Sequence, residues 1–254
     1  MYFNDLHILY YVAIAVLGLA IGKIAAWCNI RIPEKKTIFS REFFQASKKG
    51  LPNNYIFMTS NACIYVALLY KFGINPVFIQ NFDLIKYLTL VPMLLLVFSI
   101  DSKKRIIPNR LTLTIFEVGL ILAFIYGINN LNMAKDYILG MICGAAIFIV
   151  ITLLGWAIAG KESMGIGDVK LMGALGLYFG IGPISEIAML SFFVAAIFSI
   201  LILFVRIVIL KIKDEYIPFG PFIVIATLAC ILLPTNYIFD TFMEFCRFLG
   251  DKLF

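Results

Sequence analysis

The chain has little charge and almost no histidine. Only 14% of its 254 residues are Asp, Glu, Lys or Arg, and 62% are hydrophobic. Soluble domains are typically about 25% charged, so this composition excludes an ordinary soluble enzyme and indicates a membrane protein. The one histidine is His7. A protease with a Ser–His pair needs a histidine near its serine, and a zinc protease with the HExxH motif needs two, so this chain can build neither.

The cysteines of the chain do not have the spacing of a metal-binding motif. The five cysteines are Cys28, Cys63, Cys143, Cys230 and Cys246, an odd number, and the sequence holds no CxxC pair. The spacing therefore gives no indication of a zinc knuckle or of a disulfide framework. Most of these cysteines lie in apolar runs, where we interpret them as small apolar side chains.

Long apolar runs dominate what is present. A membrane-spanning helix needs roughly 20 mostly apolar residues, and the runs predict an all-α, polytopic membrane protein with about eight transmembrane helices. The predicted helices lie at about 6–28, 55–72, 84–101, 111–128, 137–159, 169–183, 185–206 and 217–234. The sixth is short. We interpret residues 1–254 as a single integral membrane domain with a short cytoplasmic cap at 29–54, because this connection is too short to form its own core.

Basic residues indicate the orientation of these helices. Most of the 21 Lys and Arg residues lie in alternate connections, which fall on one side of the membrane if eight helices cross it. Cytoplasmic loops carry an excess of Lys and Arg, so that side is predicted to be cytoplasmic. Asp101 and Asp168 both fall on it. We therefore expect a multi-pass protein of the cytoplasmic membrane whose two acids lie at the inner face.

Asp168 stands in the segment that carries the strongest functional signal, between Gly165, Gly167 and Lys170. An ionisable group beside a membrane-spanning run is costly and is by default a functional candidate. The two glycines permit backbone conformations that other residues resist and let a substrate backbone come close. The alternative is that Asp168 is a helix cap in a tight turn. That reading leaves a second acid at the same face unexplained.

Asp101 ends the apolar run 91–100 and is followed by a basic stretch and Pro108. Because Pro108 cannot continue a helix but suits a fresh start, Asp101 is expected near a helix end. Taken alone, the loop sequence favours the interpretation that Asp101 is a solvated charge beside a basic cluster. The presence of a second acid, Asp168, at the same membrane face favours the interpretation that the two acids form a pair. Two close carboxylates cannot both ionise cheaply, so one stays protonated. The charged member can activate water against a peptide bond while the protonated member polarises the carbonyl.

Glu117 offers a different interpretation of the same acids. It lies about two turns into the fourth predicted helix, where it is a hydrogen-bonded packing residue or a proton-relay group. A polytopic transporter could use Asp101, Asp168 and Glu117 as proton or cation sites. Such a protein would need no Gly-x-Gly turn beside the acid and would more often show internal halves.

Further glycines follow Asp168. Gly173, Gly176 and Gly180 recur at spacings of three and four residues, which predicts one helix face in close contact with a neighbour. One candidate for this neighbour is the helix that ends in Asp101.

The chain resembles the type IV prepilin peptidase family, membrane aspartic proteases with a GxGD motif. Residues 160–171 resemble the GxGD block and its flanks, and Asp101 with 107–109 resembles the first-aspartate block. Residues 217–222 resemble a third segment of the family. A presenilin-like protease shares the second-aspartate motif, but its first aspartate follows a tyrosine within a helix, whereas Asp101 follows Ile100.

The resemblance implies a catalytic pair of Asp101 and Asp168. Its motifs also mark residues that would bind substrate or support the active site, namely Gly165, Gly167, Lys170, Glu162, Pro108 and Asn109. The implied partners are membrane lipid and prepilins or pseudopilins of type IV pilus or type II secretion systems. Their short basic leaders would be cut after glycine at the cytoplasmic face. No nucleic acid is expected as a partner.

The chain departs from the family in one segment. Many members carry a zinc-binding pair of CxxC motifs after the first helix and also N-methylate the new N-terminus with S-adenosylmethionine. Residues 29–54 hold no CxxC, so we expect no zinc or other metal. Proteolysis by two aspartates needs no cofactor, and S-adenosylmethionine is expected only if methylation is retained.

Overall fold

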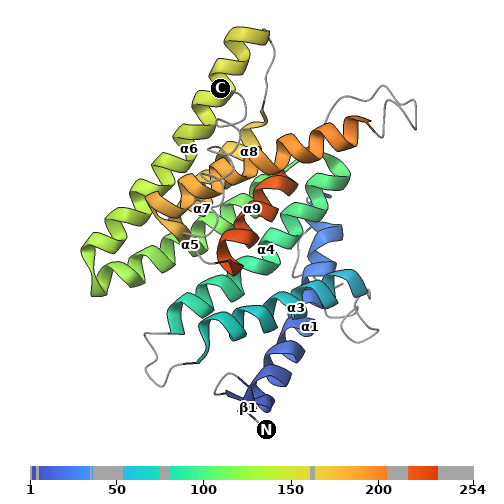
Figure 1. The fold of residues 1–254 in the computed structure, drawn as a ribbon, viewed down its shortest axis with the longest axis vertical. Coiled ribbons are helices and arrows are strands. Elements are labelled where there is room, and N and C mark those ends of the chain that lie inside the picture. The colour runs from blue at the N-terminus through green and yellow to red at the C-terminus, as the bar shows by residue number, and fades with distance from the viewer. Residues whose placement is uncertain are drawn as a thin grey trace, which may run out of the picture. The chain divides into compact units, whose positions relative to one another are not determined.

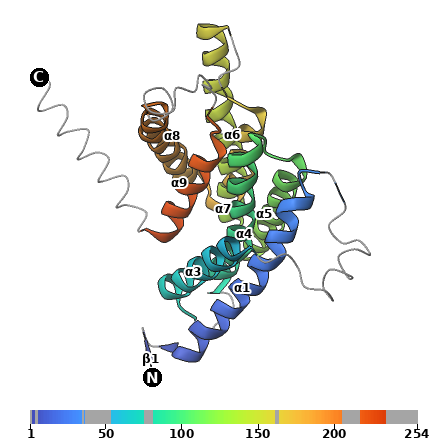
Figure 2. The ribbon, with the colours of Figure 1, turned by 90° about the vertical axis from the view of Figure 1, so that its right-hand side faces the viewer.

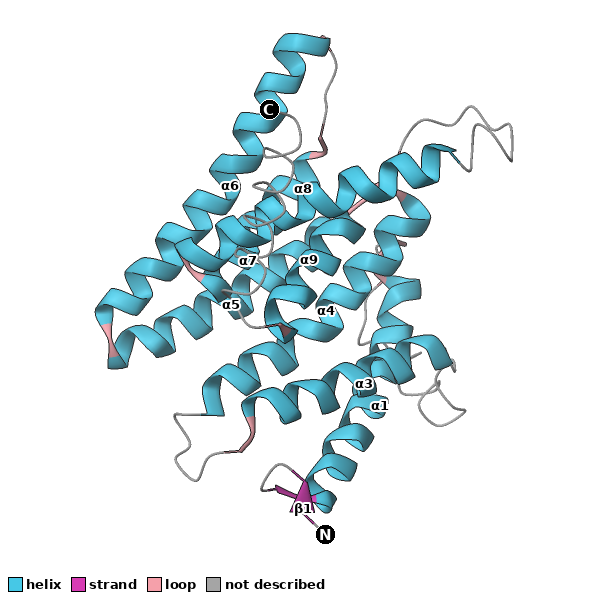
Figure 3. Ribbon diagram, viewed as in Figure 1, coloured by secondary structure: helices cyan, strands magenta, loops and turns pink. Residues whose placement is uncertain are grey.

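The computed structural model describes residues 2–3, 6–34, 36, 54–74, 81–160, 164–204 and 217–233. Two-residue strands, β1 (Tyr2–Phe3) and β2 (Leu6–His7), pair antiparallel, and the remaining elements in these ranges are helices (Figures 1 and 3). The helices are α1 (Ile8–Arg31), α3 (Tyr55–Phe72), α4 (Phe82–Lys104), α5 (Asn109–Asn129), α6 (Leu131–Ala159), α7 (Ile166–Phe179), α8 (Ile181–Phe204) and α9 (Gly220–Leu232). The all-α, polytopic prediction is confirmed. Each predicted helix has its counterpart.

Six of these helices are long and apolar enough to cross a membrane. The exceptions among the described helices are α7, with 14 residues, and α9, with 13. At 1.5 Å per residue, 14 residues rise only about 21 Å, less than the roughly 30 Å of a bilayer's hydrocarbon core. The sequence predicted a short sixth helix at 169–183, and the observed helix, α7, ends earlier, at Phe179. Most of the predicted cap at 29–54 lies outside the described residues.

The chain divides into two compact units, Met1–Glu117 and Val118–Phe254, with the boundary inside α5. In the first unit α1 packs closely against α3 (Figure 2). A Cβ added to Gly18 would lie 2.7 Å from the Cα of Ala62. Beside it, the buried Asn61 side chain donates through Nδ2 to the Gly18 carbonyl oxygen at 2.8 Å. Small residues and an interhelical hydrogen bond thus hold the pair, as in other membrane helix contacts.

In the second unit the backbones of α6 and α7 meet through glycines. A Cβ on Gly176 would collide with the backbone of Gly140, and one on Gly144 would lie 2.7 Å from the Met172 carbonyl oxygen. The close contact predicted from the glycine face is therefore confirmed, and its partner is α6. Gly180, with φ of 77°, then turns the chain into α8.

The carboxylate of Asp136 on α6 accepts a hydrogen bond from the first residue of α8. The Ile181 backbone N–H donates to Asp136 Oδ1 at 3.3 Å, and a Cβ on Gly180 would collide with the same carboxylate. Farther along, α6, α8 and the residue that precedes α9 meet in an aromatic cluster. Phe148, Phe192 and Phe219 have ring centroids 5.1–5.8 Å apart. The second unit is therefore built around α6, which contacts both α7 and α8.

The α6–α7 contact can be tested with Gly176→Ala. The added methyl group meets backbone, which cannot rotate away, so the helices must separate. Overpacking of this kind costs about 1–3 kcal/mol, and we expect a lower melting temperature in detergent. The matched control is Gly182→Ala in α8, where an added Cβ has no atom within 4 Å. Equal melting temperatures for the two variants would contradict the packing described here.

Candidate active site

Asp101 lies in the last turn of α4, on the buried face of the helix that also carries Leu94 and Val97. Its side chain is 4% exposed. The helix closes at Arg105, whose N–H donates to the Asp101 carbonyl oxygen at 2.8 Å and whose φ of 56° is left-handed. The position at a helix end was predicted from Pro108. A solvated charge, which the loop sequence alone favoured, is the wrong interpretation.

Asp168 is the third residue of α7 and is 7% exposed. Gly165 is the N-cap of α7, and the Asp168 N–H donates to the Gly165 carbonyl oxygen at 3.0 Å. A Cβ on Gly165 would lie 3.4 Å from Asp168 Oδ2, so the carboxylate lies against the glycine. Asp168 is therefore inside the first turn and is not itself the cap, which corrects the alternative interpretation of this residue.

The reason for glycine at position 165 also differs from the prediction. Gly165 has φ of −72° and ψ of 140°, an ordinary extended conformation, and Gly167 is helical. Neither residue uses the left-handed region that favours glycine. The left-handed glycine of this segment is Gly160, with φ of 64°, which ends α6. What Gly165 provides is space beside the Asp168 carboxylate.

The residues predicted to support the site lie near the starts of two helices. Pro108 precedes α5, and its carbonyl oxygen accepts from the Leu111 N–H at 2.9 Å. Asn109, the first residue of α5, accepts at its carbonyl oxygen from the buried Thr112 hydroxyl at 3.0 Å. Lys170 is exposed in α7. Glu162 lies outside the described residues.

The acid expected to face the interior in α5 does not do so. Glu117 is exposed, which corrects the prediction that it is a buried packing or relay residue. Glu186 on α8 is instead the additional acid with a buried carboxylate oxygen, Oε2. Glu186 was not predicted from the sequence, although an acid at the sixth position of the apolar run that forms α8 was a usable signal.

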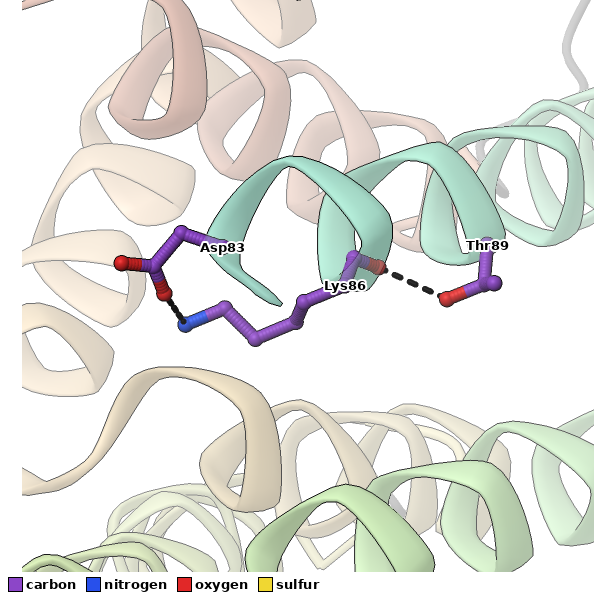
Figure 4. Close-up of polar contacts among 3 residues, drawn as sticks. All are labelled: Asp83, Lys86 and Thr89. Carbon is purple, nitrogen blue, oxygen red and sulfur yellow. Dashed lines mark hydrogen bonds and ion pairs between the residues drawn. The ribbon is translucent and has the colours of Figure 1, made fainter. Parts of the chain in front are cut away.

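A buried basic residue was also missed. Lys86 in α4 is 5% exposed, and its Nζ lies 3.0 Å from Asp83 Oδ1 (Figure 4). The Thr89 hydroxyl donates to the Lys86 carbonyl oxygen at 2.8 Å. The signal was an acid three residues before a lysine at a helix start. Fifteen residues separate Lys86 from Asp101, which is about 22 Å along the helix, so this ion pair lies at the opposite end of α4.

Asp101 belongs to the first unit and Asp168 to the second, and their pairing stays a prediction. Among the described residues, no group of three or more His, Cys, Asp or Glu side chains could hold a metal ion. The carboxylates of Asp101 and Asp168 have little contact with solvent, and each can take part in proton transfer.

The role of Gly165 can be tested by increasing its side chain stepwise. Gly165→Ala places a methyl group in ordinary contact with Asp168 Oδ2, whereas Gly165→Val adds two further carbons against the carboxylate. If Asp168 is catalytic, we expect alanine to reduce the turnover of a cleavable prepilin less than tenfold and valine to reduce it more than tenfold. The alanine variant should keep the wild-type melting temperature in detergent, and the valine variant should lose more turnover than folded protein. Equal turnover for the valine variant and the wild type would contradict this role.

Comparison with known proteins identifies the central part of the chain. Residues 88–204 match the family model described as the Type IV leader peptidase family. The prepilin leader peptidase/N-methyltransferase of Aeromonas salmonicida (strain A449) is 35% identical over 130 residues, which are 50% of this chain and 42% of the relative. The Xanthomonas campestris pv. campestris protein of the same name is 33% identical over 170 residues, 66% of this chain and 54% of the relative.

A third relative, the prepilin leader peptidase/N-methyltransferase of Escherichia coli (strain K12), is 31% identical over 81 residues, 32% of this chain and 35% of the relative. The chain spans about half the length of the Aeromonas salmonicida and Xanthomonas campestris relatives. No solved structure matches it. The matched segment runs from α4 to α8 and includes both Asp101 and Asp168.

Proposed function

We propose that this chain, whose residues 88–204 match the type IV leader peptidase family, is a membrane aspartic endopeptidase. Its substrates would be prepilins or pseudopilins, whose basic leader it would cut after a glycine at the cytoplasmic face. One observation carries the proposal: the family segment holds two aspartates that are 4% and 7% exposed, each in the end turn of a helix.

The burial of these aspartates supports a catalytic role. An ionised carboxylate loses favourable hydration when it is buried, so a buried acid persists in a membrane protein mainly where it is paired or functional. Asp101 and Asp168 are each buried next to a polar connection. A water molecule and an extended peptide could reach such a position from the aqueous side.

The helices between the two aspartates support a shared membrane face. Asp101 is at the carboxyl end of α4, and Asp168 is at the amino end of α7. The two intervening helices, α5 and α6, each contain a segment long and apolar enough to cross the membrane. Two crossings return the chain to the face where it started. Arg105, Arg110 and Lys170 belong to that face, so by the positive-inside rule we assign it to the cytoplasm.

In the proposed reaction one carboxylate is charged and the other is protonated, because two close carboxylates share a proton. The start of a helix favours negative charge, so we assign the charged role to Asp168 and the protonated role to Asp101. Asp168 accepts a proton from water as the water oxygen bonds to the peptide carbonyl carbon. Asp101 donates to the carbonyl oxygen. The carbon–nitrogen bond then breaks as the leaving nitrogen takes the proton from Asp168, and a hydroxyl group of the tetrahedral intermediate returns a proton to Asp101.

Zinc has no role in this proposal. The relatives' names say nothing of metal, and this chain has no CxxC pair, which a zinc site of the expected kind would need. The two carboxylates supply the acid and the base that peptide hydrolysis requires, so no step depends on a cofactor.

Single substitutions test the catalytic pair. Asp101→Asn and Asp168→Asn keep the shape of each side chain but remove its acid–base function. We expect each to reduce leader removal from a co-expressed prepilin by at least about 100-fold. The matched control is Glu117→Gln, which changes an exposed acid in the same family segment and should leave cleavage unchanged. Processing at the wild-type rate by either aspartate variant, correctly inserted in the membrane, would refute the assignment.

We extend the proposal to methylation of the newly exposed N-terminus, with S-adenosylmethionine as donor, because the relatives' names join both activities. The mass of the processed pilin tests this part separately. We expect one added methyl group on the mature N-terminus when the enzyme is present. A correctly cut but unmodified product would remove methylation from the proposal and leave the peptidase unaffected.

A further inference from the structure

A pocket of about 260 Å³ opens between the start of α3 and the end of α4 in the first unit. Its apolar part includes Phe57, Leu95 and Phe98. Its polar part includes Asn54, Ser102 and Lys103. One cavity therefore joins an aromatic and aliphatic wall to a polar rim that carries a positive charge.

The pocket is distinct from the position of Asp101, although both are near the end of α4. Leu95, Phe98 and Ser102 are spaced three and four residues apart and share one face of the helix. Asp101 follows Leu94 and Val97 on the buried face. At 100° per residue these faces diverge by more than a quarter of a turn. A ligand in the pocket would therefore not sit on the proposed catalytic carboxylate.

The length and composition of the two helices place the pocket at one membrane boundary. Both α3 and α4 are long and apolar enough to cross a membrane, and the pocket is formed where α3 begins and α4 ends. Lipid head groups occupy this level, whereas acyl chains lie beside the apolar turns of the same helices. The pocket lining changes from polar to apolar in the same direction, because Leu95 is two turns deeper in α4 than Lys103.

The charge of the rim selects the kind of lipid. Lys103 is the one charged residue among the described residues that line the pocket, and no acid is among them. The amino end of α3, on the same rim, adds a partial positive charge. Hydroxyl and amide groups of Ser102 and Asn54 can donate to phosphate oxygens. A negatively charged head group complements this arrangement better than a head group of zero net charge.

We propose that this pocket binds an anionic phospholipid, with its phosphate at Lys103 and Ser102 and an acyl chain along Phe57 and Phe98. A whole drug-sized ligand typically fills about 300–1,000 Å³, so the pocket holds the phosphate and the upper part of one chain. The proposal does not depend on peptidase activity, because lipid binding is measured without substrate.

The charge at Lys103 gives the first test. The full chain, purified in detergent, is equilibrated with phosphatidylglycerol or with phosphatidylcholine of the same acyl chains, and bound lipid is counted by native mass spectrometry. We expect the wild type to retain phosphatidylglycerol preferentially and Lys103→Gln to lose about fivefold of that preference. The matched control is Lys104→Gln, which removes the neighbouring charge outside the pocket and should behave like the wild type.

The shape of the pocket gives the second test. Leu95→Trp fills the apolar part while keeping Lys103, and we expect it to weaken the retention of phosphatidylglycerol without lowering the melting temperature. Unchanged preference in Lys103→Gln or unchanged binding in Leu95→Trp would overturn the proposal. Equal retention of phosphatidylcholine by the wild type, or displacement of the lipid by glycerol phosphate at equal concentration, would overturn it as well. Displacement by a prepilin peptide would also overturn it, because the pocket would then belong to the substrate.

Discussion

The close approach of the α6 and α7 backbones determines how the Asp168 carboxylate is held. Lipid tails are as apolar as leucine, so helices in a membrane associate through tight packing of small residues instead of through hydrophobic burial. Gly140 and Gly176 provide that packing. Because α7 has only 14 residues, it cannot cross a bilayer as an independent helix, and its position depends on α6. Asp168, in the first turn of α7, is thereby fixed to a packed helix instead of a loop.

The two candidate aspartates are placed by opposite helix ends. Asp101 stands before the left-handed Arg105 that closes α4, and Asp168 stands after Gly165, which opens α7 and leaves room for the carboxylate. The two helix dipoles therefore affect the two carboxylates in opposite ways, because the start of a helix favours negative charge and its end disfavours it. This difference gives the proposed pair one member suited to carry charge and one suited to carry a proton. The basic residues that follow Asp101 lie outside the buried face that bears it.

The sequence was sufficient for features that depend on length and spacing. The apolar runs predicted the helices, and the glycine spacing after Asp168 predicted a close helix contact. Features that depend on which side of a helix faces inward were harder, because helices that are apolar all round give no pattern that marks the buried face. This is why Glu117 was expected inside but is exposed. Glu186 and Lys86 could be noticed as charges in or near apolar runs, but the sequence did not indicate that they face inward.

The central claim is that the Asp101 and Asp168 side chains meet at the cytoplasmic face. Its most direct test replaces both by cysteine, alone and together, in a chain whose five native cysteines have been removed. We predict that a membrane-impermeant thiol reagent labels each single cysteine only from the cytoplasmic side, and that a short thiol cross-linker joins the two in the double variant. Labelling of the two positions from opposite sides of the membrane would contradict the account.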